Sequence, residues 1–216
     1  ADSVLGYLAD LIRIPTDNPP GDCAAAATRV ASEFETLGLG VERYDVVPPS
    51  GPSVPTVIGW LGPRTMTPDL VLNAHVDTSP KGDGWSVEPR GASRRNGRMF
   101  GRGATLSKAD VAVYTYAAAA QPRDRESLGT VAVVVTADEG SGGDNGPRHL
   151  LEEFGLRPRR AICPGLTHSV RIAHDGCVQM KITVRGRACH QALVDPATEP
   201  MRLAIDLARA IVVAGD

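Results

Sequence analysis

Two short runs of apolar residues, each followed at once by polar residues, limit the folds open to this chain more than any other feature. The stretches Leu70–Val76 and Thr130–Thr136 are dominated by apolar residues, as in strands buried on both faces of a parallel sheet. The first contains His75 near its end and leads into Asp77, and the second leads into Glu139. Because ligands gather at the carboxyl ends of parallel strands, these polar residues form the first candidate site.

Helical patterns alternate with strand patterns through most of the chain. We expect helices at Val4–Ile12, Ala24–Leu37, Ser107–Ala120, Pro147–Phe154 and Glu199–Val213. We expect further strands at Val41–Val47, Thr56–Leu61, Arg160–Cys163, Val170–His174 and Val178–Val184, and a turn at Asn96-Gly97 within a long loop. This alternation predicts the α/β class, with a layered, mostly parallel sheet and helices on both of its faces.

The character of the sequence changes near residue 176, where a strand, a turn and a helix follow one another. We therefore expect a catalytic-type α/β domain at 1–175 and the start of a smaller α+β lid or dimerisation domain at 176–216. A lone strand and helix do not make a domain, and an uncovered strand edge at Val178–Val184 invites pairing with another chain. We expect a homodimer, or association with a chain that supplies the missing half.

Charge and cysteine content exclude several classes of partner and compartment. The net charge of −2 and the isoelectric point near 6.2 give no signal for nucleic acid or an anionic membrane. No apolar run is long enough to span a bilayer, and the N-terminus lacks the pattern of a signal peptide. The cysteines show no Cys-x-x-Cys spacing, which favours reduced thiols in a cytoplasmic protein.

The residues that follow the two apolar runs have the chemistry of an active site. His75 and Asp77 are two apart in a strand and point to the same side, so that the carboxylate can orient the imidazole by accepting its ring proton. Glu139 is a candidate general base, because a carboxylate beside a metal can take a proton from bound water. Taken singly, each residue is more often structural: an acidic cap, or a hydrogen-bonded histidine.

The order of the motifs resembles that of a known family. The chain contains, in order, His75-Val-Asp77, Trp85, Gly101-Arg-Gly-Ala104 with Lys108, Thr136-Ala-Asp-Glu139 and Val184-Arg-Gly-Arg-Ala-Cys-His190. The order is similar to that of the di-zinc amidohydrolases and peptidases that include the aminoacylases, acetylornithine deacetylase, succinyl-diaminopimelate desuccinylase and glutamate carboxypeptidase. The similarity runs nearly end to end.

The resemblance implies a cofactor, a substrate class and roles for individual residues. His75 would bind zinc, Asp77 would orient it, and Glu139 would act as the general base. His190 would sit on the lid domain, reach into the partner subunit's site and stabilise the developing oxyanion. The substrate would be an N-acyl amino acid or a small peptide whose amide bond is hydrolysed.

Several positions depart from the pattern of the family. Leu106 stands where the family has the Asp that bridges both metals, Gly140 where it has a second Glu, and Pro164 where it has a third carboxylate ligand. A catalytic zinc needs about three or four ligands, and His75 alone remains of those that the resemblance implies for this stretch. We therefore expect a degenerate site with a single metal ion or none.

Other side chains are candidates to replace the lost ligands. Asp110 lies one helical turn after Leu106 and could substitute for the bridging carboxylate, although an ordinary solvated helix residue is the alternative interpretation. Asp144, His168 and His174 are further candidates.

Two classes of function remain open from the sequence. The first is an amidohydrolase-like enzyme with an altered metal centre, or a metal-independent acyl-transfer or cyclising enzyme that relies on Glu139 and His190. The second is a catalytically silent scaffold or partner subunit that kept the fold and lost the zinc. The presence of Asp77, Glu139 and His190 favours the enzyme, whereas the replaced carboxylates favour the silent scaffold.

Overall fold

The computed structural model of the chain describes residues 2–122, 129–165, 169–170, 172–173, 182–186 and 199–215. The chain divides into two compact units, residues 1–170 and residues 171–216. The described part of the second unit contains the helix α5 (Pro200–Gly215). The predicted domain boundary after residue 175 lies among residues that the structure does not describe, and it stays a prediction.

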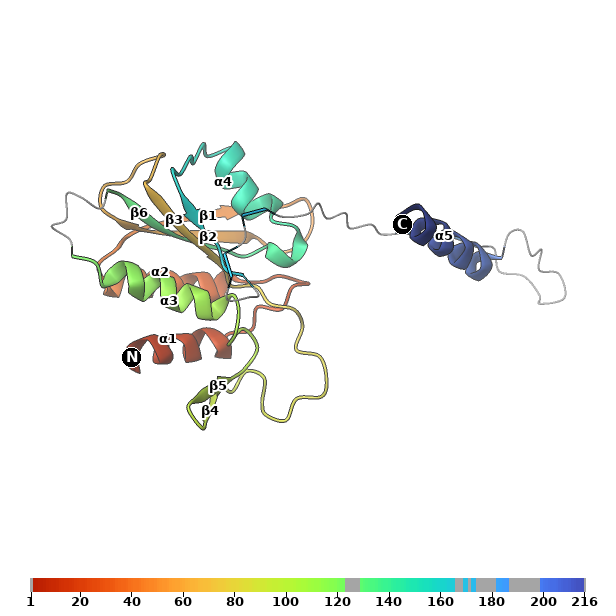
Figure 1. Cartoon of the computed structure of the whole chain (residues 1–216), viewed down its shortest axis with the longest axis horizontal. Helices are drawn as coiled ribbons and strands as arrows, with labels where there is room; N and C mark the ends of the chain where they lie inside the picture. Colours follow the sequence, from red (N-terminus) through yellow and green to blue (C-terminus); the bar gives the residue numbers. More distant parts are fainter. Residues whose placement is uncertain are drawn as a thin grey trace. The chain divides into compact units, whose positions relative to one another are not determined.

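The first unit is built on a mixed sheet with the strand order β1-β2-β6-β3-β7 (Figure 1). The strands are β1 (Gly40–Val46), β2 (Val54–Leu61), β3 (Leu70–His75), β6 (Val131–Thr136) and β7 (Ala161–Ile162). β6 and β7 both pair in parallel with β3, and β2 pairs antiparallel with β1 and β6, so that β2 alone runs against the other strands. His75 pairs with Thr136, so β3 and β6 end at the same level of the sheet.

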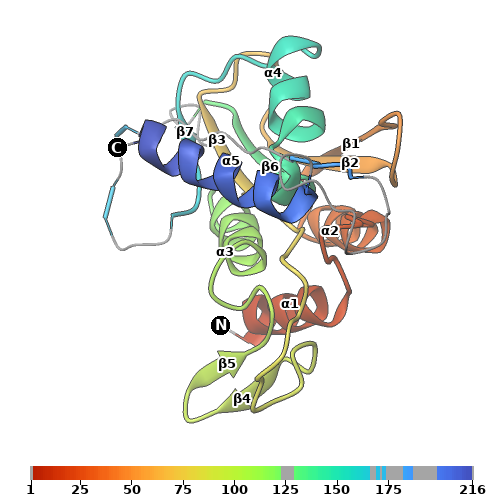
Figure 2. The same cartoon turned by 90° about the vertical axis from the view of Figure 1, so that its right-hand side faces the viewer.

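Helices cover both faces of the sheet, which confirms the predicted fold class (Figures 1 and 2). One face carries α2 (Ala24–Thr36) and α3 (Lys108–Ala119), with α1 (Asp2–Arg13) packed against these two helices on the side away from the sheet (Figure 1). The other face carries the π-helical turn η2 (Asp144–Arg148) and α4 (His149–Glu152). Neighbouring residues of β2 show the two layers, because Val57 belongs to the core beneath α2 and Ile58 to the core beneath α4. Every residue of β6 is buried, as its apolar run predicts.

The predicted strands after residue 165 are wrong where the structure describes them. Val170, Ile172 and Ala173 are not in a strand, and neither are residues 182–184. Val170 and Ile172 are 92% and 96% exposed. Strand-forming residues need a paired neighbour and a buried face, and the described chain gives these residues neither.

A short hairpin was not predicted, although its turn was. β4 (Ser93–Arg95) and β5 (Arg98–Phe100) pair around Asn96 and Gly97, which have φ values of 51° and 74°. These positive values are those of a type I′ turn, as the Asn-Gly pair predicts. The flanking strands are rich in arginine and mostly exposed, so they lack the apolar alternation by which a strand is recognised.

Candidate active site

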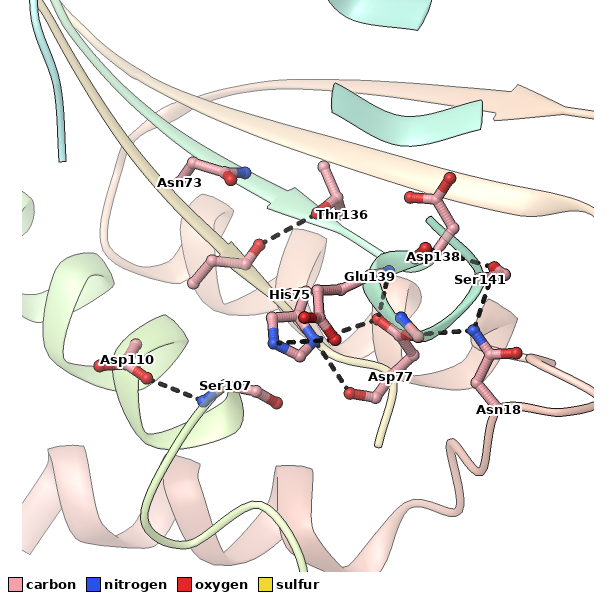
Figure 3. Close-up of polar contacts among 12 residues, drawn as sticks. Asn18, Asn73, His75, Asp77, Ser107, Asp110, Thr136, Asp138, Glu139 and Ser141 are labelled. Carbon is pink, nitrogen blue, oxygen red and sulfur yellow. Dashed lines mark hydrogen bonds and ion pairs between the residues drawn. The ribbon is translucent and has the colours of Figure 1, made fainter. Parts of the chain in front are cut away.

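The parallel pairing of β3 and β6 brings the two predicted polar clusters together. Both strands end at the same edge of the sheet, and the chain continues into Asp77 after β3 and into the turn η1 (Glu139–Ser141) after β6. Figure 3 shows His75, Asp77 and Glu139 converging at this edge. The nearest oxygen of the Glu139 carboxylate lies 4.0 Å from His75 Nε2.

His75 is held in one orientation by Asp77. Its Nδ1 lies 3.1 Å from Asp77 Oδ1 and 3.0 Å from the backbone oxygen of the same residue. Burial acts to lower the pKa of His75, but the hydrogen bond with Asp77 and the charges of Asp77 and Glu139 outweigh burial and raise it. Both neighbours of Nδ1 are acceptor oxygens, so Nδ1 carries a proton and donates to Asp77. The other ring nitrogen, Nε2, faces Glu139.

Asp77 has a buried carboxylate, and each of its two oxygens accepts two hydrogen bonds. Its side chain is 1% exposed, and Oδ2 accepts hydrogen bonds from Asn18 Nδ2 and the Gly140 amide, each at 2.9 Å. Oδ1 accepts from His75 and, at 3.2 Å, from the Glu139 amide. Burial acts to raise the pKa of Asp77, but these hydrogen bonds outweigh it and lower the pKa, so the carboxylate stays ionised.

The turn that carries Glu139 is anchored by the preceding Asp138. One oxygen of Asp138 accepts hydrogen bonds from the Asn145 and Gly146 amides at 2.8 and 2.9 Å, which ties η1 to the start of η2. The Glu139 side chain is 68% exposed, so its carboxylate remains accessible to a ligand.

A pocket of about 310 Å³ opens beside these residues. Its walls include His75, Glu139, Trp85 and Arg102. The Arg102 guanidinium stacks on the Trp85 ring at 5.1 Å, and both side chains donate to the backbone oxygen of Lys81. The pocket therefore combines an imidazole and a carboxylate with an aromatic wall fixed by an arginine.

Two of the three positions where the resemblance implies carboxylate ligands also belong to this region. Leu106 and Gly140 line the pocket, and neither has a side-chain donor atom. Within the described ranges, no three His, Cys, Asp or Glu side chains come together as a metal ion requires. This donor set does not fit a pair of zinc ions.

The candidate substitute ligands are engaged elsewhere or lie outside the described residues. The Asp110 carboxylate accepts a hydrogen bond of 2.8 Å from the Ser107 amide and so caps the first turn of α3 (Figure 3). Asp144 forms an ion pair with Arg148 at 3.0 Å. His168, His174 and the predicted oxyanion donor His190 are outside the described part, and Pro164 follows β7 without lining the pocket.

The structure shows roles for two residues near the site that the sequence did not indicate. Lys108 is buried, and its Nζ donates to the Leu11 and Ile14 oxygens at 2.8 Å each, which joins α3 to the end of α1. Burial lowers the pKa of Lys108 to about 8. Asn18 contacts Asp77 across 59 positions of sequence, and no local pattern signals such a contact.

The comparisons with known proteins agree with this architecture. The model of peptidase family M20/M25/M40 matches residues 71–208. The succinyl-diaminopimelate desuccinylase of Methylobacterium radiotolerans is 30% identical, over 98% of this chain and 56% of that protein. The same-named protein of Rhodospirillum centenum is 30% identical over 93% of this chain and 54% of its own. The chain thus spans about half the length of the curated relatives it matches.

Solved structures share the fold at low sequence identity. An M20 family metallo-carboxypeptidase from Sulfolobus solfataricus superposes with a TM-score of 0.63 at 20% identity, over 76% of this chain and 38% of that one. Human carnosine dipeptidase 1 gives a TM-score of 0.59 at 22% identity, over 70% of this chain and 35% of that one. These likenesses bear on the fold alone.

Proposed function

The chain belongs to peptidase family M20/M25/M40, and we propose that its strand-end pocket hydrolyses the amide bond of an N-acyl amino acid or a small peptide. One observation carries the proposal: Asp77 fixes His75 so that Nε2 faces the accessible Glu139 carboxylate at 4.0 Å. The curated relatives at 30% identity are named succinyl-diaminopimelate desuccinylases, which is the name of an amide-cleaving enzyme.

Glu139 would act as the general base of this reaction. Its carboxylate takes a proton from a water molecule as the water oxygen attacks the carbonyl carbon of the substrate. The same proton then passes to the amine nitrogen as the carbon–nitrogen bond breaks, so Glu139 returns to its starting state. By resemblance to the family, His190 would donate to the carbonyl oxygen while negative charge develops on it.

We further propose that the metal centre is degenerate and holds one divalent cation or none, in place of a zinc pair. Leu106 and Gly140 support this proposal, because they line the pocket at the positions where the family resemblance implies carboxylate ligands. Zinc or another divalent metal bound at His75 would supply Lewis-acid chemistry.

The predicted association with a second chain is also a proposal. Apolar side chains of α5 support it, since Met201, Val212 and Val213 are among the exposed large hydrophobic residues. The expected assembly is a cytoplasmic homodimer or a complex with a chain that supplies further lid residues. The mass in dilute solution tests this: a monomer without a partner contradicts it.

A silent scaffold is the second candidate function, and the apolar Leu106 at the pocket wall favours it. Elemental analysis of the purified full chain, followed by assays on a panel of N-acyl amino acids and dipeptides with and without Zn²⁺, Co²⁺ or Mn²⁺, separates the two. Turnover of a panel member supports the amide hydrolase. No turnover under any metal condition, together with stable binding to another protein, supports the scaffold.

A further inference from the structure

Asn18 lies in a loop whose backbone is fixed to the segment that follows the site. The Asn18 amide donates to the Thr78 oxygen at 2.8 Å, and the Thr78 amide donates to the Thr16 oxygen at 2.9 Å. The Gly21 amide donates to the Asp17 oxygen at 2.8 Å and closes the loop. Gly21 has a φ of 83°, which favours glycine. These backbone hydrogen bonds place the Asn18 side chain at the site.

The side-chain amide of Asn18 joins three segments that are distant in sequence. Its Nδ2 donates to Asp77 Oδ2 at 2.9 Å and to Ser141 Oγ at 3.2 Å, as Figure 3 shows. A primary amide nitrogen has two hydrogens, so both are used. One hydrogen bond goes to the carboxylate that orients His75, and the other goes to the turn that carries Glu139.

The space beside Gly140 is narrow where its backbone meets Asp77. A Cβ atom there would lie 3.3 Å from Asp77 Oδ2, slightly closer than ordinary contact, and 3.4 Å from Asn18 Nδ2, at the limit of ordinary contact. The Gly140 amide and the Asn18 amide therefore approach the same carboxylate oxygen side by side. Glycine at this position therefore gives both amides room at Asp77 Oδ2.

From these contacts we propose that Asn18 is a positioning residue that holds the Glu139–Gly140 turn against Asp77, and thereby sets the Glu139 carboxylate opposite His75. The hydrogen bonds of the Glu139 and Gly140 amides to Asp77 require that carboxylate to keep its present rotation. Without Asn18, Oδ2 loses a donor and η1 loses its link to the loop. The effect on catalysis rests on the proposed function, whereas the effect on the turn does not.

The test compares Asn18→Ala with Asn73→Ala in the full chain. Asn73 is a matched control, because it lies in β3 and donates one part-buried hydrogen bond to Val134 O at 3.1 Å, outside the Asp77 network. We expect the amide ¹H and ¹⁵N shifts of Glu139 and Gly140 to change in Asn18→Ala and to stay in place in Asn73→Ala. On a substrate found by the panel, kcat should fall about tenfold or more with KM nearly unchanged, as misplacement of a reacting group predicts.

The outcomes separate this proposal from the proposed function. Unchanged Glu139 and Gly140 shifts in Asn18→Ala overturn the positioning role, whatever the activity. Changed shifts with kcat and KM equal to those of the wild type overturn the catalytic consequence. If the wild-type chain turns over no substrate, the proposed function fails, and the shifts alone decide the role of Asn18. Should Asn18→Ala not fold, Asn18→Ser removes the same amide and keeps a short polar side chain in the loop.

Discussion

At the scale of single residues, two buried titratable side chains lie close to the site without entering it. Cys23 is fully buried, and its pKa is raised to about 12, first by burial and then by the charge of Asp77. Lys108 is buried as well, and its pKa is lowered by burial. Both shifts follow from the same cause, since removal from water disfavours the charged form of either group.

The Cys23 thiol should therefore resist alkylation in the folded protein. Only the thiolate reacts quickly, and at pH 8 burial keeps Cys23 protonated and out of reach. Cys163 is exposed and should react first. Treatment with iodoacetamide followed by peptide mapping measures both residues, with a urea-unfolded sample as the control. Equal labelling of Cys23 and Cys163 under native conditions would show that Cys23 is not buried.

Lys108 should add more to stability as the pH rises. Its pKa is about 8 in the folded protein and ordinary, near 10.5, in the unfolded chain, so between these values the unfolded chain binds more protons. The free energy of unfolding of the wild type relative to Lys108→Met should then grow between pH 8 and pH 10, by about 1 to 3 kcal/mol. Urea titrations at several pH values measure this difference. A constant difference would mean that Lys108 keeps an ordinary pKa.

The pairing of His75 with Asp77 could be predicted from sequence, because residues two apart in a strand share a side. The closeness of Glu139 to His75 could also be predicted, because the carboxyl ends of parallel strands meet at one edge of the sheet. Asn18 could not be found in this way. Its contact joins a turn-rich loop to the segment that follows β3 through tertiary packing, and the local sequence describes only the loop.

At the scale of elements, α2 packs on β2 at a point where β2 has no side chain. A Cβ atom on Gly59 would lie 2.6 and 2.8 Å from two carbons of the Phe34 ring, and Phe34 is fully buried. The glycine lets the helix approach the sheet closely, and the ring fills the space that it leaves.

Gly59→Ala should accordingly destabilise the protein by about 1 to 3 kcal/mol, the usual cost of overpacking a core. Gly40→Ala is the matched control, because Gly40 also lies in the sheet and a Cβ there meets Trp60 Cβ at an ordinary 3.5 Å. Chemical denaturation of both variants gives the comparison. If both substitutions have the same small effect, the contact between α2 and β2 is looser than described.

Elements were predictable where burial gives them a pattern. β6 is buried throughout, and its run of apolar residues predicted a strand. β4 and β5 are mostly exposed and rich in arginine, so their sequences did not predict strands. The opposite error occurred at Val170 and Ile172, which have strand-forming side chains but are exposed and unpaired in the described chain. Local preference decides a strand only when a neighbouring strand completes it.

At the scale of the whole molecule, the order of motifs predicted the family and the fold, and the match of residues 71–208 confirms the family. The activity is less predictable, because it depends on the side chains that line the pocket. Leu106 and Gly140 line it, and neither has a side-chain donor atom for a metal ion. A fold supports many activities, and the side chains of the site decide which one remains.

The most direct test of the account is the ratio of two turnover rates on the best substrate of the panel. Glu139→Gln removes the proposed base, and Glu152→Gln removes an exposed carboxylate of α4, away from the pocket. We expect kcat to fall at least about 100-fold in Glu139→Gln, as for the loss of a general base, and to stay at the wild-type value in Glu152→Gln. Equal rates in the two variants would contradict it.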